Sequence, residues 1–109
     1  LEYNIMSEVT VETGNVHLEG VLKLHKQTES PSSASDHGHI FAKEEEESTH
    51  LYAMDSDGNE TKISPHNQEG EWEYYCRNKK TGKHIKINME KMIRKLEEIT
   101  GETFIEIIE

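Results

Sequence analysis

The chain has 109 residues, of which 32% are hydrophobic and 31% are charged, and its formal net charge is −10. This length fits one domain, and we expect a piece of a longer protein because the chain begins with Leu1 rather than Met. The acidic balance argues against nucleic acid as a partner, since phosphate contacts need Lys and Arg, and against anionic membrane surfaces. No apolar run is long enough to predict membrane insertion.

So few apolar residues make a complete core in a single copy of the chain doubtful, because a short chain buries a modest part of its surface even with an ordinary composition. Partial disorder and a core shared between copies are the two alternatives. The apolar residues are periodic rather than scattered, and periodicity indicates ordered elements. We therefore expect several copies of the chain to share one core.

The first 27 residues predict short β-strands. Val9 and Val11 alternate with polar residues, which is a strand pattern. After a Gly-Asn turn, apolar residues recur at one parity through residues 16–26, so we interpret this segment as one broken strand or two short ones. Gly20 interrupts the parity and predicts a bulge or a close backbone approach.

Residues 28–70 predict a loop followed by a hairpin unit. The Ser-rich segment TESPSSASD leads into the strand HIFAKE, a charged reversal at 44–47 and the strand HLYAM. Asp57-Gly58 then predicts a tight hairpin turn, because glycine supplies the positive φ that such a turn needs. The acidic residues around this turn do not match a calcium loop, which needs its glycine at the sixth position and flanking helices.

Residues 71–109 predict a third hairpin, a helix and a closing strand. The hairpin reverses at NKKTG, and the helix spans 88–100, with Asn88 as its N-cap and Gly101 just past its end. Two i,i+4 ion pairs, from Glu90 to Arg94 and from Arg94 to Glu98, are expected on its outer side. The β-branched run FIEII at 104–108 predicts a strand, which would aggregate if it were left exposed.

The apolar residues of the predicted helix form a seam with 3-4-3 spacing, as in the a and d positions of a coiled coil. A helix of this length is marginal in water without packing, so the seam must face either the preceding hairpin or the same helix of other copies. The seam residues are Met89, Met92, Leu96 and Ile99.

Two histidines, His37 and His39, lie two residues apart at the start of a predicted strand and so point to one face. Two imidazoles in one chain make a poor metal site. Three chains around a threefold axis would supply six imidazole nitrogens, which suits an octahedral transition metal rather than zinc. The alternative is that both are polar residues at the entry to a strand.

No catalytic motif is present: the chain has no G-x-S-x-G, no P-loop and no H-E-x-x-H. We therefore expect no enzyme. An alternative function is glycan binding by a monomeric β-sandwich, with a ligand surface formed by Trp72, Tyr74 and Tyr75. Aromatic residues in a strand are also typical of a core, and Trp72 and Tyr74 share a parity with Cys76 that Tyr75 does not.

Residues 16–67, about half of the chain, resemble the distal part of phage tail fibres and related virion fibre proteins. The resemblance lies in an apolar strand, a Ser-rich loop, the strand IFAK, a reversal, and LYAMDSDGNET before a short strand. It implies a homotrimer of intertwined hairpins that attaches to the host surface or links virion parts. The motif His37-Gly38-His39 also resembles the His-x-His motif of tail-fibre needles, which implies an axial iron ion held by three chains.

Together these patterns predict a mainly β homotrimer of short intertwined hairpins. It ends in a short helix that forms a three-stranded coiled coil and in a closing strand. One structural domain would hold shaft-like strands at 1–27, the hairpin unit of the fibre at 28–70, and the third hairpin, trimerising helix and terminal strand at 71–109. The resemblance implies an extracellular place in the virion, with a host-surface glycan or protein and other virion proteins as partners. It also implies one iron or other octahedral metal ion per trimer.

Overall fold

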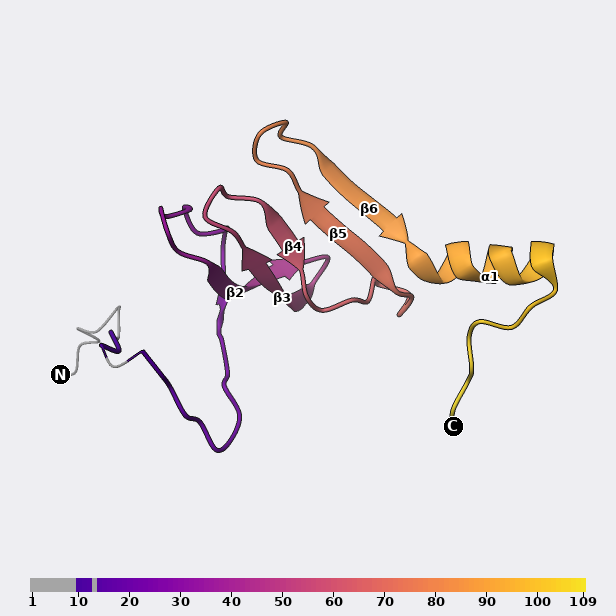
Figure 1. Ribbon diagram of the computed structural model, residues 1–109, viewed down its shortest axis with the longest axis horizontal. Helices are drawn as coiled ribbons and strands as arrows, with labels where there is room; N and C mark the ends of the chain where they lie inside the picture. Colours follow the sequence, from indigo (N-terminus) through magenta and orange to yellow (C-terminus); the bar gives the residue numbers. More distant parts are fainter. Residues whose placement is uncertain (1–9, 13) are drawn as a thin grey trace.

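The computed structural model describes residues 10–12 and 14–109, and it is mainly β, with one six-stranded sheet and one short C-terminal helix (Figure 1). This confirms the predicted class of secondary structure. The elements in chain order are β1 (Lys26–Gln27), β2 (His39–Glu45), β3 (Ser48–Met54), β4 (Glu60–Lys62), β5 (Glu73–Arg77), β6 (His84–Asn88) and α1 (Met89–Thr100).

The strands lie in the sheet in chain order, from β1 to β6. β1 runs parallel to β2, and every later neighbour is antiparallel. The reversal predicted at 44–47 joins β2 to β3 through only Glu46 and Glu47, whose φ angles are 52° and 69°. Positive φ at both positions is the geometry of a type I′ turn, which follows the twist of the strands.

The predicted turn at Asp57-Gly58 joins β3 to β4, and Gly58 has a φ of 92°. The Asp55 carboxylate organises this loop: its Oδ1 accepts the backbone N–H groups of Asp57 at 3.0 Å and Asn59 at 2.8 Å. The Asn59 side chain donates to Oδ2 at 2.9 Å. The Asn59 side chain and backbone hydrogen bonds lower the pKa of Asp55. The acidic loop is therefore a turn built on one carboxylate.

The predicted helix is confirmed, and β6 leads into it without a loop. The Asn88 side chain accepts the Lys91 N–H at 2.9 Å, and Gly101 ends the helix with a φ of 75°. Arg94 pairs with Glu90 at 3.2 Å as predicted, whereas Glu98 pairs with Lys95 rather than with Arg94. Figure 1 shows α1 projecting away from the sheet along the long axis of the molecule.

The closing strand predicted at 104–108 is wrong for the single chain, which forms no strand there. The Glu97 carboxylate instead accepts the N–H groups of Phe104 at 2.7 Å and Ile105 at 2.9 Å. These amides are satisfied by a side chain, and no strand of the described chain lies beside them. The C-terminal segment consequently runs back below the helix (Figure 1).

The N-terminal strands are largely wrong as well. Among the described residues before β1, none is assigned to a strand, and the element predicted at 16–26 is reduced to the two residues of β1. The alternating segment around Val11 forms no strand in its described part, and Val9 lies outside the described residues. The physical reason is the same as for residues 104–108. An alternating pattern produces a strand only where a neighbouring strand supplies hydrogen bonds, and no strand of the described chain lies beside residues 14–25.

The core lies on one face of the sheet, here called the inner face. It contains Phe41 of β2, Tyr52 and Met54 of β3, and Tyr75 of β5, each at most 5% exposed. The Phe41 and Tyr52 rings stack with centroids 5.5 Å apart, and Tyr75 meets Tyr52 edge-on at 6.2 Å. These are favourable arrangements for aromatic rings. The core is therefore a short row of aromatic side chains.

Charged residues fill the rest of the inner face. Glu60 is fully buried and Lys62 is 6% exposed. Lys43 contacts Glu60 at 2.9 Å, and Lys62 contacts Glu73 at 3.0 Å. Buried charges persist only when they are paired and hydrogen-bonded. The Lys43–Glu60 pair spans β3, from β2 to β4, and the Lys62–Glu73 pair joins the neighbouring strands β4 and β5. The sheet thus buries a face that is as ionic as it is aromatic.

Candidate assembly surface

The opposite side of the sheet carries its aliphatic side chains, and the large ones are exposed, although Ala42 is buried at 1% exposed. Strand registers place these residues together: Ala42 lies opposite Leu51, and Tyr74 lies opposite Ile87. Because side chains alternate between faces along a strand, none of them points toward the inner face. We call this surface the apolar sheet face, and its large members are Ile40, Leu51, Ile63, Tyr74, Ile85 and Ile87.

The large side chains of the apolar sheet face are between 39% and 67% exposed. Antiparallel sheets with one solvated face normally bury the apolar side and expose the polar side. In this chain the buried face holds the aromatic core together with ion pairs, and the aliphatic face is the exposed one. Several large apolar side chains exposed on one face of a sheet mark a site of protein association.

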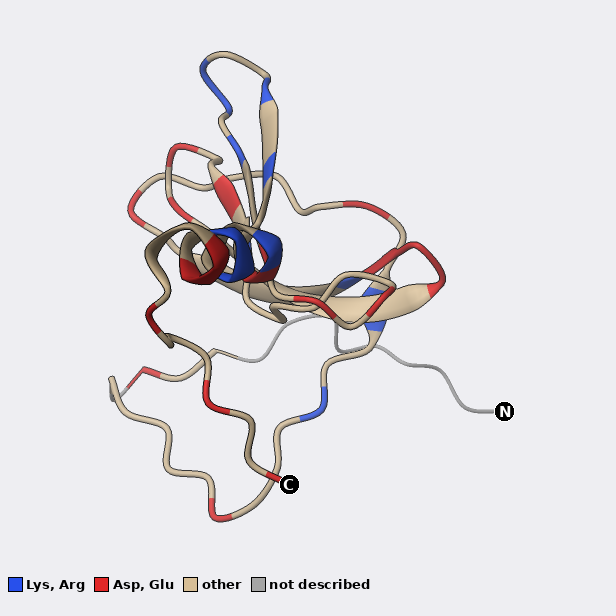
Figure 2. Ribbon diagram, turned by 90° about the vertical axis from the view of Figure 1, so that its right-hand side faces the viewer, with Lys and Arg blue, Asp and Glu red and all other residues tan. Residues whose placement is uncertain are grey.

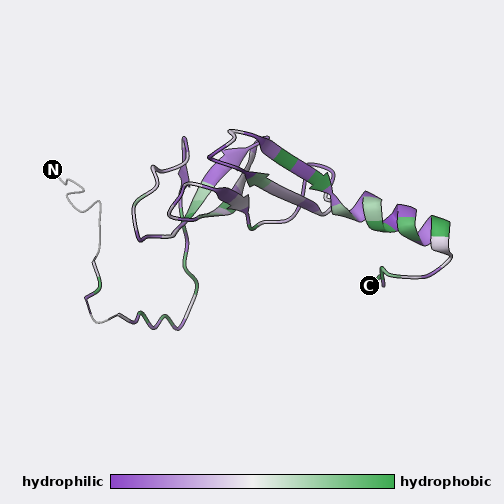
Figure 3. Ribbon diagram, turned by 45° about the horizontal axis from the view of Figure 1, so that its top comes forward, coloured by the Kyte–Doolittle hydropathy of each residue, from purple (hydrophilic) through white to green (hydrophobic). Residues whose placement is uncertain are grey.

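The predicted helix seam is exposed in the same way. Met89 is 36% exposed, Met92 51%, Leu96 46% and Ile99 71%. Figure 3 shows apolar residues along one side of α1 and polar residues along the other. The structure therefore answers one question left open by the sequence: the seam does not pack on the preceding hairpin.

Trp72 joins the apolar sheet face to the helix seam. Its carbonyl oxygen accepts the N–H of Met89, the first residue of α1, at 3.0 Å. Its indole is 42% exposed and precedes Tyr74 by two residues, so it has the parity of the apolar sheet face. The two exposed apolar surfaces therefore meet at the start of the helix.

The C-terminal segment adds a third exposed apolar group. Phe104 is 54% exposed, Ile107 70% and Ile108 85%. The hydrogen bonds from the Ile105 and Phe104 amides lower the pKa of Glu97. The ionised form of this carboxylate therefore holds the segment in place. The segment has a fixed start beside the helix, and its apolar side chains remain available to other copies.

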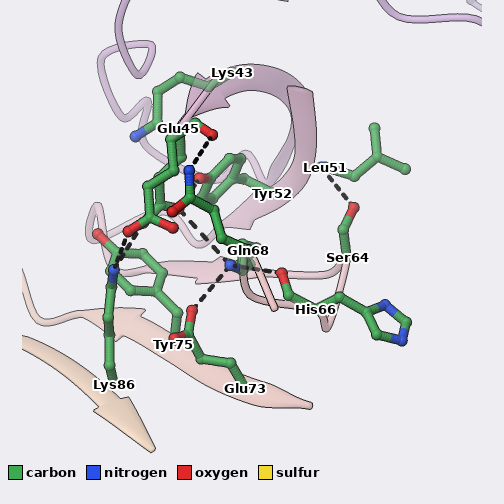
Figure 4. Close-up of polar contacts among 12 residues, drawn as sticks. Lys43, Glu45, Leu51, Tyr52, Ser64, His66, Gln68, Glu73, Tyr75 and Lys86 are labelled. Carbon is green, nitrogen blue, oxygen red and sulfur yellow. Dashed lines mark hydrogen bonds and ion pairs between the residues drawn. The ribbon is translucent and has the colours of Figure 1, made fainter. Parts of the chain in front are cut away.

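Around Tyr52, the inner face pairs its own charges. Tyr52 donates its hydroxyl to Glu45 at 2.7 Å, and Lys86 contacts the same carboxylate at 3.1 Å (Figure 4). Burial acts to raise the pKa of Glu45, but the Tyr52 and Lys86 hydrogen bonds outweigh it and the pKa is lowered. Burial and the Glu45 carboxylate raise the pKa of Tyr52. Glu45 is therefore ionised and Tyr52 neutral at neutral pH.

The two histidines considered as metal ligands lie at the entry to β2. His37 is exposed, and its Nδ1 donates to the Ser35 carbonyl oxygen at 2.7 Å, which leaves Nε2 free. His39 is half-buried, and its buried Nδ1 has no hydrogen-bond partner in the described part of the chain. Within residues 10–12 and 14–109, no three His, Cys, Asp or Glu side chains gather as a metal site.

The predicted glycan surface does not form as one platform. Trp72 and Tyr74 are exposed on the apolar sheet face, at 42% and 40%. Tyr75 is 5% exposed on the inner face, where its hydroxyl lies 2.8 Å from His84 Nδ1. Adjacent residues of a strand point to opposite faces, so these three rings cannot contact one sugar.

The sequence did not predict which face of the sheet is buried and which is exposed. In β2 the residues alternate between Phe41, Lys43 and Glu45 on one parity and Ile40 and Ala42 on the other. Both parities carry apolar residues, so alternation alone cannot decide which face is buried. A usable signal was the pairing of Glu60 with Lys62 at one parity, since β4 has no apolar residue.

No family model matches the chain, and neither curated proteins nor solved structures yield a match. Among the described residues, no helix is both long and apolar enough to cross a membrane.

Proposed function

We propose that the chain is a trimerising structural domain of a virion fibre and that its work is assembly and host-surface attachment, without catalysis. The observation that carries this proposal is the apolar surface that the chain builds but does not cover. It runs over the apolar sheet face, passes Trp72 and continues along the helix seam. Identical copies are its natural occupants, because obligate homomeric interfaces resemble a hydrophobic core cut in half.

The proposed assembly places three copies side by side and parallel. α1 leaves the sheet at one end (Figure 1), so three parallel helices can pack their seams on one axis while all three sheets remain at the same level. The 3-4-3 spacing of the seam suits such packing. The C-terminal segment of each copy, held beside α1 by Glu97, would then cover apolar residues of its neighbours and lock the chains.

The choice of three chains and of a virion rests on the resemblance of residues 16–67 to phage tail fibres. The structured part of that region is the hairpin unit from β2 to β4, in which both predicted turns are present. In the proposed fibre this unit presents the attachment surface to a host glycan or protein. Its extracellular position in the virion follows from the same proposal.

An axial metal is the second element of the proposal. The His37 Nδ1–H is held by a backbone carbonyl, which fixes the tautomer that leaves Nε2 free to bind a metal, as metal-ligating histidines commonly do. His39 has the inner-face parity of Phe41, so the axial site requires the entry to β2 to turn toward the axis in the trimer. In that arrangement, three copies of His37 and His39 would hold one iron or other octahedral ion. The bound ion would cross-link the chains without taking part in a reaction.

Sedimentation equilibrium of the purified chain tests the assembly. The expected species has three times the 12.6 kDa mass of one chain, and it dissociates on dilution together with a loss of helix signal. A folded 12.6 kDa species at every concentration would refute the proposal. Metal analysis of protein purified without a nickel resin tests the second element: one ion per three chains supports the axial site, and a metal-free trimer removes it.

A further inference from the structure

A pocket of about 580 Å³ opens beside the inner face, between the Ser-rich loop and the ends of the sheet strands. It brings together three cationic side chains and one carboxylate, that of Glu29, in a chain whose net charge is −10. Figure 2 shows several basic residues on the hairpin formed by β5 and β6, in addition to those on α1. The residues of the pocket that carry the argument are Lys43, Arg77, Lys79, Thr28, Ser32 and Ser33.

Glu60 forms the base of this charged cluster. It accepts a hydrogen bond from the Ser30 hydroxyl and contacts Lys43 at 2.9 Å. The Lys43 ammonium also donates to the Ser30 oxygen at 2.7 Å. These three groups satisfy one another, so the loop is fixed to the inner face and the Glu60 carboxylate is already used by Lys43.

Arg77 is held by this cluster less tightly than Lys43, through an ion pair to Glu60 without a hydrogen bond. Its nearest carboxylate oxygen, on Glu60, is 3.7 Å away, which is too far for a hydrogen bond. Its Nε is buried and has no partner among the described residues. A guanidinium offers five N–H groups in a planar fork that matches a carboxylate. Within the described part of the chain, the only ion pair of Arg77 is this long one to Glu60, and the side chain is still 29% exposed at the wall of the pocket, where a terminal N–H can bind an anion.

Lys79 supplies a second cation at the rim. Its backbone N–H donates to the Asn59 side-chain oxygen at 2.9 Å, which ties it to the β3–β4 turn. Its side chain crosses Gly58 so closely that a Cβ on Gly58 would lie 3.2 Å from Lys79 Cγ. The turn glycine thus leaves room for Lys79 to lie along the pocket, while its exposed end remains free.

We propose that this pocket binds an acidic saccharide through its carboxylate. Arg77 and Lys79 would bind the carboxylate, and the hydroxyls of Thr28, Ser32 and Ser33 would bind the sugar hydroxyls. The volume lies within the range of small-molecule sites, roughly 300–1,000 Å³. The pocket is on the side of the sheet opposite the apolar sheet face, so trimer assembly leaves it open. Binding in this pocket does not depend on the proposed fibre function. Only its biological role, as the site of host attachment, rests on that proposed function.

Titration of the full chain with D-glucuronate, followed by calorimetry, tests the pocket, with D-glucose and inorganic phosphate as the other two probes. We expect glucuronate to bind and glucose not to bind. Arg77→Gln should weaken binding at least about tenfold and Lys79→Gln several-fold, as for the loss of charge-assisted hydrogen bonds. Lys80→Gln, a matched change outside the pocket, should leave the affinity unchanged.

Absence of glucuronate binding overturns the proposal, as does unchanged affinity in both pocket variants. Phosphate binding as tight as glucuronate binding would refute the saccharide assignment and leave a simple anion site. If Arg77→Gln fails to fold by circular dichroism, the exposed Lys79→Gln decides. Sedimentation of the same samples separates the two proposals, because a monomer that binds glucuronate refutes the trimer alone.

Discussion

Leu96 lies in the middle of the helix seam and gives the sharpest test of assembly. Its side chain is 46% exposed in the single chain, and full burial of a leucine stabilises by about 1.5–3 kcal/mol. Covering the exposed part is therefore worth about 1 kcal/mol per chain and about 3 kcal/mol per trimer. Since 1.4 kcal/mol is tenfold in an equilibrium constant, Leu96→Ala should lower the trimerisation constant about a hundredfold.

The assay is sedimentation equilibrium over a wide range of chain concentration. Three chains associate, so a hundredfold change in the constant raises the midpoint concentration about tenfold. Leu96→Asp should abolish the trimer, because it buries an unpaired charge in each chain. Lys91→Asp, on the exposed outer side of α1, introduces the same residue away from the seam and should leave the trimer intact. A normal trimer in Leu96→Asp would show that α1 does not mediate assembly.

Two further predictions concern the β2–β3 turn and the inner face. Glu46→Asn with Glu47→Gly should raise the free energy of unfolding by about 1 kcal/mol, because both positions have positive φ and Asn-Gly is the preferred pair for this turn. Urea denaturation measures this free energy, and the control Thr49→Gly in the adjoining strand should lower it. A double variant that is no more stable than the unchanged chain would contradict the turn geometry. Because the pKa of Glu45 is lowered in the folded chain, its contribution to stability is present at neutral pH, above the unfolded pKa of about 4.3, and is lost as the pH falls through the folded pKa. Melting temperatures measured from pH 7 to pH 3 should therefore fall less steeply in Glu45→Gln than in the unchanged chain, and identical slopes would remove Glu45 from the acid response.

Local signals in the sequence predicted local structure well. The turn at Asp57-Gly58, the N-cap Asn88 and the terminating Gly101 each depend on the chemistry of a few neighbouring residues, and each is present. The predicted strand at 104–108 failed because strand formation requires a partner that the sequence pattern cannot supply. The hydrogen bonds from Phe104 and Ile105 to Glu97 depend on a reversal after the helix that no local pattern announced.

The candidate assembly surface was predictable only in part. The helix seam follows from its spacing, and the structure leaves it exposed, as assembly requires. The apolar sheet face was not predicted, because its recognition depends on knowing that Lys43, Glu45 and Lys62 point inward. Their burial is a cooperative property: each charge is tolerable inside only because a partner of opposite charge, such as Glu60 or Glu73, lies on another strand of the same face.

The exposure of the aliphatic face shows how a chain with 32% hydrophobic residues can fold and still leave many of them available for the proposed assembly. Hydrogen-bonded ion pairs fill much of the space inside the sheet, so the aliphatic residues are free to face outward. Buried ion pairs contribute little net stability, because desolvation offsets their attraction. In the proposed trimer, much of the hydrophobic stabilisation is therefore gained when other copies cover the apolar sheet face and the helix seam. Folding and association of this chain should consequently be coupled, with a stability that depends on chain concentration.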